Sequence, residues 1–321
     1  MTDKKRIFLS GPIMPDASAR LHATYDAVVH DRSTPLSADD LIGALGGVDG
    51  LLTYPNAPLN ADVIARLPDS VAVIACHAVG YDNVDLDAAR ARGIVVTNTP
   101  EVLCAATAEV AILLMLGAAR RASEGDRLIR AGEWKRWSVD FMVGTEITGQ
   151  RLGIIGMGDI GKLVARRARG FDMDIHYHNR KPLPADKAEG ATYHDSIESL
   201  LGVSDVLSIN CPLTPATHHL LNEERIALLP RGAIVVNTAR GSIIDDAALI
   251  DALRSGQVAA AGLDVFEGEP TVNPDYLALP NTFLLPHIGS ATVTTRTAMG
   301  LRAIDNLDAF FRGDPPPDRI A

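Results

Sequence analysis

Arginine, glutamate and histidine side chains suited to proton transfer stand at three separate places late in the chain. They are Arg240, Glu269 and His287. Each follows closely on a short apolar run that predicts a buried β-strand. In an open α/β sheet, ligands bind beyond the carboxyl ends of the parallel strands. We therefore expect these three side chains to converge on one crevice.

Together the three side chains could reduce the carbonyl group of a 2-oxo acid by hydride transfer. Arg240 would bind the substrate carboxylate and polarise the ketone, and His287 would be the acid in reduction and the base in oxidation. Glu269 would favour the protonated imidazole. Taken singly, each residue also has a purely structural interpretation. Arg240 could form a surface ion pair, Glu269 could be an exposed residue before a proline, and His287 could be a hydrogen-bonded core histidine.

A glycine-rich loop indicates where a dinucleotide would bind. Gly156, Gly158 and Gly161 form a GxGxxG pattern after the apolar run Leu152–Ile155 and open the helical pattern Ile160–Arg169. The first glycine makes the turn, the second lets backbone N–H groups approach a pyrophosphate, and the third lets helix and strand pack closely. The alternative is a glycine-rich turn that binds no ligand.

The end of the next expected strand, Asn179-Arg180-Lys181, bears on which nucleotide is used. NAD-binding units usually place an acidic residue here to accept hydrogen bonds from the ribose 2′-hydroxyl. Asp172 and Asp174 stand at the opposite end of this strand. Arg180 and Lys181 would bind a 2′-phosphate through charge-assisted hydrogen bonds. The sequence therefore predicts NADPH/NADP in preference to NADH/NAD, unless these are solvated charges on a turn.

Alternating strand and helix patterns predict an α/β protein of doubly wound parallel sheets. The first third predicts five strands, near residues 6–9, 26–29, 50–53, 71–75 and 94–97, and helices near 38–45, 60–66 and 86–92. After a helix at 105–121, six further strands are expected, near residues 151–155, 174–178, 206–210, 233–237, 259–264 and 283–285.

The C-terminal segment 292–311 has one apolar helical stripe and no strand pattern of its own, so it must pack on another element. We expect it to return to the first domain. The expected domains are a discontinuous substrate domain, residues 1–100 and 290–321, and a dinucleotide-binding domain, residues 101–289.

Composition excludes several classes of protein. The 321 residues, 47% of them apolar, are typical of a globular chain of about two domains. The net charge of −10 argues against nucleic acid or an anionic membrane as partner. Cys76, Cys104 and Cys211 fit neither a disulfide framework nor a zinc site, and we expect no metal. The run 105–119 contains Glu109 and is too short to span a membrane, and no signal peptide is evident. A cytoplasmic protein is expected.

The chain resembles the D-2-hydroxyacid dehydrogenase family, and within it the glyoxylate/hydroxypyruvate reductase branch. The resemblance covers nearly the whole sequence. Its most specific segments are residues 77–85, 156–161, 211–214, 237–241, 262–270 and 286–290. It implies two flavodoxin- or Rossmann-like domains with the active site in the cleft between them.

The resemblance also implies roles for particular residues. Arg240, Glu269 and His287 match the catalytic set, and the backbone amides of Val79 and Gly80 match a cradle for the substrate carboxylate. The matched cofactor contacts, besides Gly156 and Gly158, are Asp159, Ile160, Gly161, Asn179, Arg180, Lys181, Cys211, Pro212, Thr238 and Asp264.

Members of the family are typically homodimers, and in this branch a tryptophan that matches Trp137 reaches toward the neighbour's substrate site. The sequence itself offers only two tryptophans, Trp134 and Trp137, in a charged connecting segment. Buried anchors within one chain are the alternative interpretation.

Departures from the family patterns narrow the expected reaction. No acidic residue stands at the position that selects NAD, which favours the NADPH-using branch. We expect no regulatory domain after Ala321, unlike the longer phosphoglycerate dehydrogenases of the family. Formate dehydrogenases of the family carry glutamine at the position of Glu269, so that reaction is not expected. We expect NADPH-dependent reduction of glyoxylate or hydroxypyruvate to the D-2-hydroxy acid, although glycolate has no stereocentre. The alternatives are a reductase of 2-ketogluconate or another bulkier 2-oxo acid, and a nucleotide-sensing interaction protein.

Overall fold

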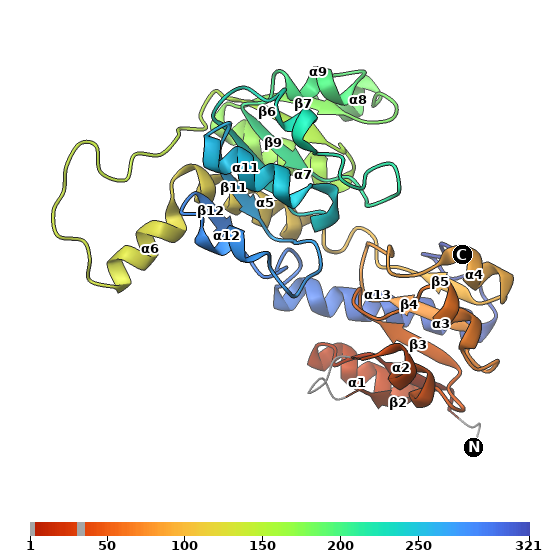
Figure 1. Ribbon diagram of the computed structural model, residues 1–321. Coiled ribbons are helices and arrows are strands. Elements are labelled where there is room, and N and C mark those ends of the chain that lie inside the picture. The colour runs from red at the N-terminus through yellow and green to blue at the C-terminus, as the bar shows by residue number, and fades with distance from the viewer. Residues whose placement is uncertain (1–3, 31–35) are drawn as a thin grey trace. The chain divides into compact units, whose positions relative to one another are not determined.

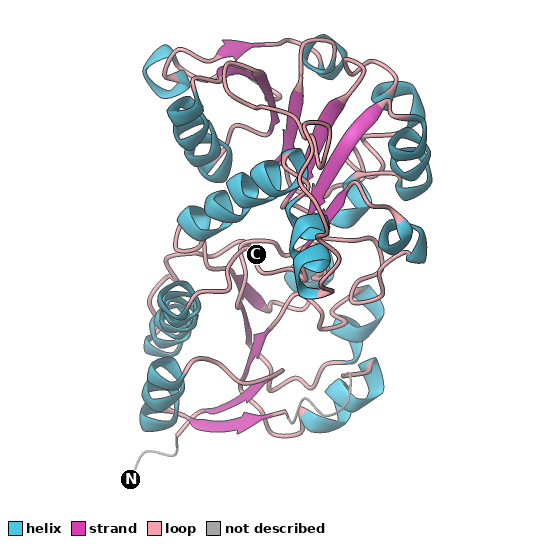
Figure 2. Cartoon of the chain, turned by 90° about the vertical axis from the view of Figure 1, so that its left-hand side faces the viewer, coloured by secondary structure: helices cyan, strands magenta, loops and turns pink. Residues whose placement is uncertain are grey.

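The computed structural model describes residues 4–30 and 36–321, which form two compact units. Unit 1 comprises Met1–Leu103 and Ala291–Ala321, and unit 2 comprises Cys104–Ser290. Residues 1–3 and 31–35, which belong to the expected range 1–100, lie outside the described residues. Each unit contains one parallel β-sheet with helices on both sides, so the expected fold class is confirmed (Figures 1 and 2).

Unit 1 contains a five-stranded parallel sheet in the order β2-β1-β3-β4-β5. This is the order of flavodoxin-like doubly wound folds. The strands are β1 (Arg6–Leu9), β2 (Asp26–Val29), β3 (Gly50–Thr53), β4 (Val73–Cys76) and β5 (Val95–Thr97).

Helices cover both faces of this sheet and enclose two hydrophobic cores. The C-terminal helix packs against α1 and β4, so residues from the two ends of the chain share one core. The helices of unit 1 are α1 (Pro15–Thr24), α2 (Ala38–Ala44), α3 (Ala61–Arg66), α4 (Leu86–Ala91) and α13 (Val293–Arg312).

A buried polar network fixes the last residues of the chain to unit 1. The Asp318 carboxylate accepts hydrogen bonds from the Arg302 guanidinium, at 2.6 and 2.7 Å, and from Asn306 Nδ2 at 2.9 Å. Beyond it, Arg319 forms an antiparallel bridge with Thr97 at the edge of the sheet. The terminus is thereby held to both α13 and β5.

Unit 2 contains a seven-stranded parallel sheet in the order β12-β11-β10-β9-β6-β7-β8. Counted from β6 this is the dinucleotide-binding order 3-2-1-4-5-6 with one strand added. The strands are β6 (Arg151–Ile155), β7 (Asp174–His178), β8 (Thr192–Tyr193), β9 (Val206–Ile209), β10 (Ala233–Asn237), β11 (Val258–Leu263) and β12 (Thr282–Leu284).

The expectation of six strands in this region was wrong, because the two-residue strand β8 completes the sheet. The strands and helices that were expected lie within two residues of their observed bounds. The helices of unit 2 are α5 (Cys104–Ala119), α6 (Ala122–Arg130), α7 (Asp159–Ala168), α8 (Ala185–Ala188), α9 (Ile197–Leu201), α10 (Glu223–Ile226), α11 (Asp246–Ser255) and α12 (Pro274–Ala278), with short 3₁₀ turns η1 (Arg169–Phe171) and η2 (Gly241–Ile243).

Helix α5 packs closely on the sheet because two glycines remove side chains from the contact. A Cβ atom at Gly117 would collide with the Phe283 ring, and one at Gly262 would lie 2.7 Å from the Leu114 carbonyl oxygen. The apolar character of α5 is therefore that of a core helix. Across the described residues, no helix combines the length and apolar character needed to cross a membrane.

An arm formed by α6 and residues 131–146 extends away from the body of unit 2 (Figure 1). Helix α6 buries none of its residues. Trp134 and Trp137 are both exposed, Trp137 by 74%, so the alternative that they are buried anchors within one chain was wrong. The three cysteines are thiols.

Candidate active site

The glycine loop after β6 needs glycine at each end for a different steric reason. Gly156 has a φ of +93°, and a Cβ atom there would lie 2.7 Å from the backbone nitrogen of Cys211. A Cβ atom at Gly161 would collide with the carbonyl oxygen of Gly156. The loop can therefore pack against the end of β9 and against α7 only with glycine at both positions.

Gly158 differs because a Cβ atom there would meet nothing within 4 Å. It is the N-cap of α7, and no side chain caps the helix. The first backbone N–H groups of an uncapped helix, together with its dipole, form a binding site for an anion. Open space at Gly158 and an uncapped N-terminus fit the pyrophosphate of a dinucleotide, with Asp159, Ile160 and Gly161 in the first helical turn.

The residues after β7 divide between two roles. Asn179 holds the glycine loop, because its Oδ1 accepts a hydrogen bond of 2.7 Å from the backbone nitrogen of Met157. Arg180 and Lys181 are exposed, and among the described residues neither has an ion-pair partner. They therefore stand beside the loop with their cationic groups available to an anionic ligand.

Cys211 and Pro212 follow β9 next to the glycine loop. The backbone of Cys211 packs directly on Gly156, while Pro212 is exposed. Burial raises the pKa of the Cys211 thiol to about 11. The thiol is therefore neutral at physiological pH, and this position contributes shape rather than charge to the proposed nucleotide site.

Glu269 and His287 form a direct pair, with Glu269 Oε1 2.6 Å from His287 Nδ1. Burial acts to raise the pKa of Glu269. The hydrogen bond and charge of His287, the Phe266 N–H group and the charge of Arg240 outweigh it, so the pKa lies below its usual range. Glu269 is therefore an ionised partner for the imidazole.

Asp264 positions the histidine through the backbone of its loop. Its carboxylate oxygens accept hydrogen bonds of 2.7 Å from the N–H groups of Ile288 and Gly289, and its carbonyl oxygen accepts one from His287 N–H. Burial raises the pKa of Asp264, opposed by the two backbone bonds. These contacts hold His287 at its left-handed φ of 53°.

Arg240 follows β10 in a turn that the buried Asn237 organises. The Asn237 side chain accepts a hydrogen bond from Ala239 N–H and donates one to the carbonyl oxygen of Arg240. Thr238, half-buried, lies between them in the chain. Because the charge of Arg240 contributes to lowering the pKa of Glu269, the structure brings Arg240 near the Glu269–His287 pair.

Asn237 was not expected to contribute to this site, and Asp264 was expected as a cofactor contact and not as the residue that holds the His287 loop. Both are polar residues, 0% and 1% exposed, that end or directly follow buried apolar strands. A buried polar group must be hydrogen-bonded. Their position at the end of an apolar run could have indicated that both are buried and hydrogen-bonded. Their particular partners could not be predicted, because these depend on the conformation of the loops.

Val79 and Gly80 belong to unit 1, in the loop after β4. Both are half-buried, and the carbonyl oxygen of Val79 accepts a hydrogen bond of 2.9 Å from Asn98 Nδ2. Asn98 thus fixes this loop from the end of β5. Trp137 lies in the arm of unit 2, between α6 and β6, where its side chain is exposed.

The topology of unit 2 and its glycine loop define a Rossmann-type NAD-binding domain of an oxidoreductase. Residues 112–289 match the family model of the D-isomer specific 2-hydroxyacid dehydrogenase, NAD binding domain. The chain belongs to the D-isomer specific 2-hydroxyacid dehydrogenase family. The resemblance found in the sequence is confirmed.

Relatives match the chain over almost its full length. Glycerate dehydrogenase of Hyphomicrobium methylovorum is 45% identical over 312 residues, 97% of each chain. Glyoxylate reductase of Pyrococcus furiosus is 41% identical over 99% of this chain and 95% of that protein. The solved NADPH-dependent glyoxylate/hydroxypyruvate reductase of Sinorhizobium meliloti, in complex with NADP and malonate, superimposes with a TM-score of 0.90 at 35% identity, covering 99% of this chain and 97% of that one.

Proposed function

We propose that the protein reduces small 2-oxo acids, glyoxylate and hydroxypyruvate, to D-2-hydroxy acids with NADPH as electron donor. The observation that carries the proposal is the 2.6 Å pair of His287 and Glu269, with the charge of Arg240 acting on it, in the unit that carries the glycine loop. The names of the relatives, glyoxylate reductase and glycerate dehydrogenase, agree with this substrate class.

In the proposed reaction the nicotinamide supplies a hydride to the carbonyl carbon, and the protein supplies the proton and the charge stabilisation. The guanidinium of Arg240 binds the substrate carboxylate and polarises the carbonyl. His287 donates the proton from Nε2 to the developing alkoxide, because Nδ1 is engaged by Glu269. The products are the 2-hydroxy acid and the oxidised nucleotide.

Unit 1 is proposed to bind the substrate carboxylate through the backbone N–H groups of Val79 and Gly80. The Asn98 hydrogen bond to the Val79 carbonyl supports this role by fixing the loop. Backbone amides suit a small anion because they impose direction without adding a mobile side chain.

NADPH is proposed as the preferred cofactor. Arg180 and Lys181 support the preference. Both side chains are exposed, and they follow β7, where dinucleotide-binding domains contact the 2′-position of the ribose. Their cationic groups would form charge-assisted hydrogen bonds to a 2′-phosphate, whereas an unphosphorylated ribose offers only hydroxyls. We further propose that Thr238 and Asp264 lie near the carboxamide, and Cys211 and Pro212 beside the adenosine.

A homodimer is proposed to cover the exposed apolar side chains of the arm. Trp134, Trp137, Val139, Phe141 and Val143 are all exposed in the single chain. Such a concentration of apolar surface is typical of a protein interface. In this proposal Trp137 contributes to the substrate site of the second copy. Sedimentation at equilibrium should give twice the chain mass of 34.1 kDa.

The direct test is oxidation of NADPH and NADH with glyoxylate, hydroxypyruvate, pyruvate and 2-ketogluconate. The proposal expects the highest kcat/KM with glyoxylate or hydroxypyruvate and a lower KM for NADPH than for NADH. Preference for 2-ketogluconate would indicate a reductase of bulkier acids. Background turnover with every acid, together with tight binding of a protein partner, would contradict the enzyme function and favour a nucleotide-sensing interaction protein.

A further inference from the structure

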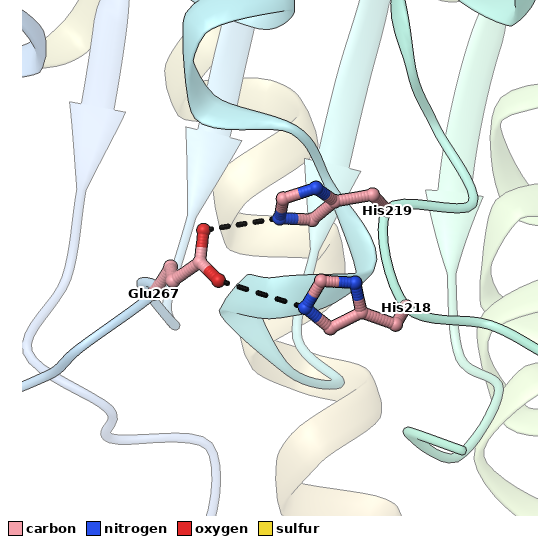
Figure 3. Close-up of side chains that lie close together, drawn as sticks. All are labelled: His218, His219 and Glu267. Carbon is pink, nitrogen blue, oxygen red and sulfur yellow. Dashed lines mark hydrogen bonds and ion pairs between the residues drawn. The ribbon is translucent and has the colours of Figure 1, made fainter. Parts of the chain in front are cut away.

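Two histidines and a glutamate of unit 2 form a cluster that the proposed reaction does not use (Figure 3). His218 and His219 lie between β9 and α10, and Glu267 lies in the loop after β11. His219 Nε2 is 3.1 Å from one Glu267 oxygen, and His218 Nε2 is 3.8 Å from the other. One ligand atom from each residue lies within 4.8 Å of the other two.

The backbone turns two consecutive side chains toward the same carboxylate. In an extended segment, neighbouring side chains point to opposite sides. His219 instead has a left-handed φ of 46°, and the rings of His218 and His219 stack with centroids 4.0 Å apart. As a result, both Nε2 atoms face the Glu267 carboxylate (Figure 3).

The turn η2 holds both ligand-bearing segments in place. His219 N–H donates to the carbonyl oxygen of Ser242 at 2.8 Å, and Leu221 N–H donates to that of Ile243 at 3.0 Å, in a parallel bridge with Ile244 directly after the turn. From the other side, a Cβ atom at Gly241 would collide with the backbone of Phe266 and Glu267. The three side chains therefore meet on a preorganised frame.

Acidic side chains lie near the cluster. Among the described residues, no lysine or arginine forms an ion pair with Glu267, whose charged-group partners are the two histidines. Burial raises the pKa of Asp246, and the negative charges of Glu267 and Asp245 add to this effect, while the hydrogen bond from Tyr276 and the charge of His219 oppose it. A cation bound at the cluster would relieve this accumulation of negative charge.

We propose that His218, His219 and Glu267 form a binding site for one divalent transition-metal ion of the Zn²⁺ class. The ion is coordinated by both Nε2 atoms and by the carboxylate, and water completes the coordination. Bond lengths of about 2.0–2.2 Å in a tetrahedral site place ligand atoms about 3.3 Å apart. The observed separations are 3.1 and 3.8 Å to the two different oxygens of Glu267, and the three ligand atoms lie within 4.8 Å of one another, so side-chain rotation must bring them together on one ion.

The types of ligand atom determine which metal ions the site would bind. Two imidazoles and one carboxylate suit Zn²⁺, Co²⁺ or Ni²⁺, whereas Mg²⁺ and Ca²⁺ prefer oxygen ligands. Bound metal would cross-link the segment at His218 to the loop that also carries Glu269. Metal binding is tested independently of catalysis, so a negative result here leaves the proposed reaction untouched.

The test is calorimetric titration of the chelator-treated full chain with Zn²⁺, without nucleotide or substrate, alongside the absorption spectrum of the Co²⁺ form. The wild-type protein should bind one Zn²⁺ at this site, and Co²⁺ should give visible bands of low coordination number. His218→Asn and Glu267→Gln should each weaken binding at this site by at least about 100-fold, because loss of even an outer-shell partner costs 10- to 100-fold.

His22→Asn serves as the matched control, because His22 is an exposed histidine on α1 of unit 1. It should bind Zn²⁺ as the wild type does. Circular dichroism establishes that the variants are folded; His218 is 53% exposed, so its substitution removes no core packing. Wild-type affinity and stoichiometry in both H218N and E267Q, or no Zn²⁺ binding by the wild type, would overturn the proposal.

Discussion

The Nδ1 atom of His287 lies 2.6 Å from Oε1 of Glu269, and this contact determines which imidazole nitrogen can serve a substrate. With Nδ1 engaged, Nε2 is the remaining proton-carrying atom. The loop that presents it is fixed by Asp264, which binds the two N–H groups after the histidine. The pair is therefore positioned by backbone contacts as well as by its own hydrogen bond.

Replacing His287 by Gln should remove most of the turnover and little of the nucleotide binding. General acid–base catalysis by one side chain contributes about 10²- to 10⁴-fold in rate, so kcat for glyoxylate reduction should fall by that factor. The Kd for NADPH, measured by nucleotide fluorescence, should stay near the wild-type value. A variant that kept wild-type kcat would exclude His287 as the proton donor.

Replacing Glu269 by Gln should move the pH dependence of reduction. The lowered pKa of Glu269 keeps it ionised at neutral pH, where its charge holds the imidazole through the 2.6 Å contact. Without that charge, kcat/KM for reduction should fall at neutral pH, and the loss of activity expected as the pH drops through the lowered pKa of Glu269 should be absent from the variant. Glu189→Gln, in the ion pair with Arg169, is the control and should leave the profile unchanged. Identical profiles in E269Q and wild type would contradict the role.

Elements with strong apolar runs were predictable, and elements without them were not. The strands β1 and β10 are apolar runs bounded by polar residues, and their observed bounds are those expected from the sequence. The two-residue β8 is too short to give a period, and α6 buries no residue, so its sequence is dominated by charge. Helix α5 was predictable because its sixteen residues include no proline and one glycine.

The candidate site was predictable in its residue types but not in its contacts. The expected partners Glu269 and His287 do meet, since both follow strands at one edge of a parallel sheet. The backbone bonds of Asp264 and the meeting of His219 with Glu267 were not foreseen. Both depend on left-handed residues, His287 and His219, which neither glycine nor asparagine marks in the sequence.

Replacing Asp318 by Asn should destabilise unit 1 through its buried network. The Asp318 side chain is 4% exposed and binds Arg302 and Asn306, so loss of its charge should cost about 2–4 kcal/mol in urea unfolding at pH 7. Burial acts to raise the pKa of Asp318, but the bonds from Arg302 and Asn306 outweigh it and lower the pKa. The contribution is therefore complete above the unfolded pKa of about 3.9 and is lost as pH falls through the lower folded value.

The difference in unfolding free energy between D318N and wild type should accordingly shrink as the pH is lowered below about 4. Asp314→Asn is the control, because Asp314 is exposed and pairs only with Arg312 among the described residues. It should change stability by less than about 0.5 kcal/mol. A difference that stays constant from pH 7 to pH 3 would contradict the assigned role of the Asp318 charge.

Alanine substitutions at two glycines of the phosphate loop should have different effects on stability and on NADPH affinity. Gly158→Ala adds a methyl group in open space, so the apo protein should remain as stable as wild type while the added group obstructs the pyrophosphate. NADPH affinity should fall about tenfold or more, the equivalent of losing one hydrogen bond to a charged group. Gly161→Ala forces α7 away from β6 and should lower stability by about 1–3 kcal/mol as well. Gly170→Ala, in equally open space, is the control. Unchanged NADPH affinity in G158A would place the nucleotide elsewhere.

Replacing Arg180 by Ala should reduce the preference for NADPH without impairing the reaction itself. A guanidinium bonded to a 2′-phosphate contributes about 1.5–3 kcal/mol, so KM for NADPH should rise about 10- to 100-fold. KM for NADH should change little, because the unphosphorylated ribose gives the guanidinium no anionic partner. Lys187→Ala removes an exposed charge of α8 in the same unit and should leave both KM values unchanged. If R180A raised KM for the two nucleotides equally, Arg180 would act on a part common to both, and the selection of NADPH would have to come from other residues.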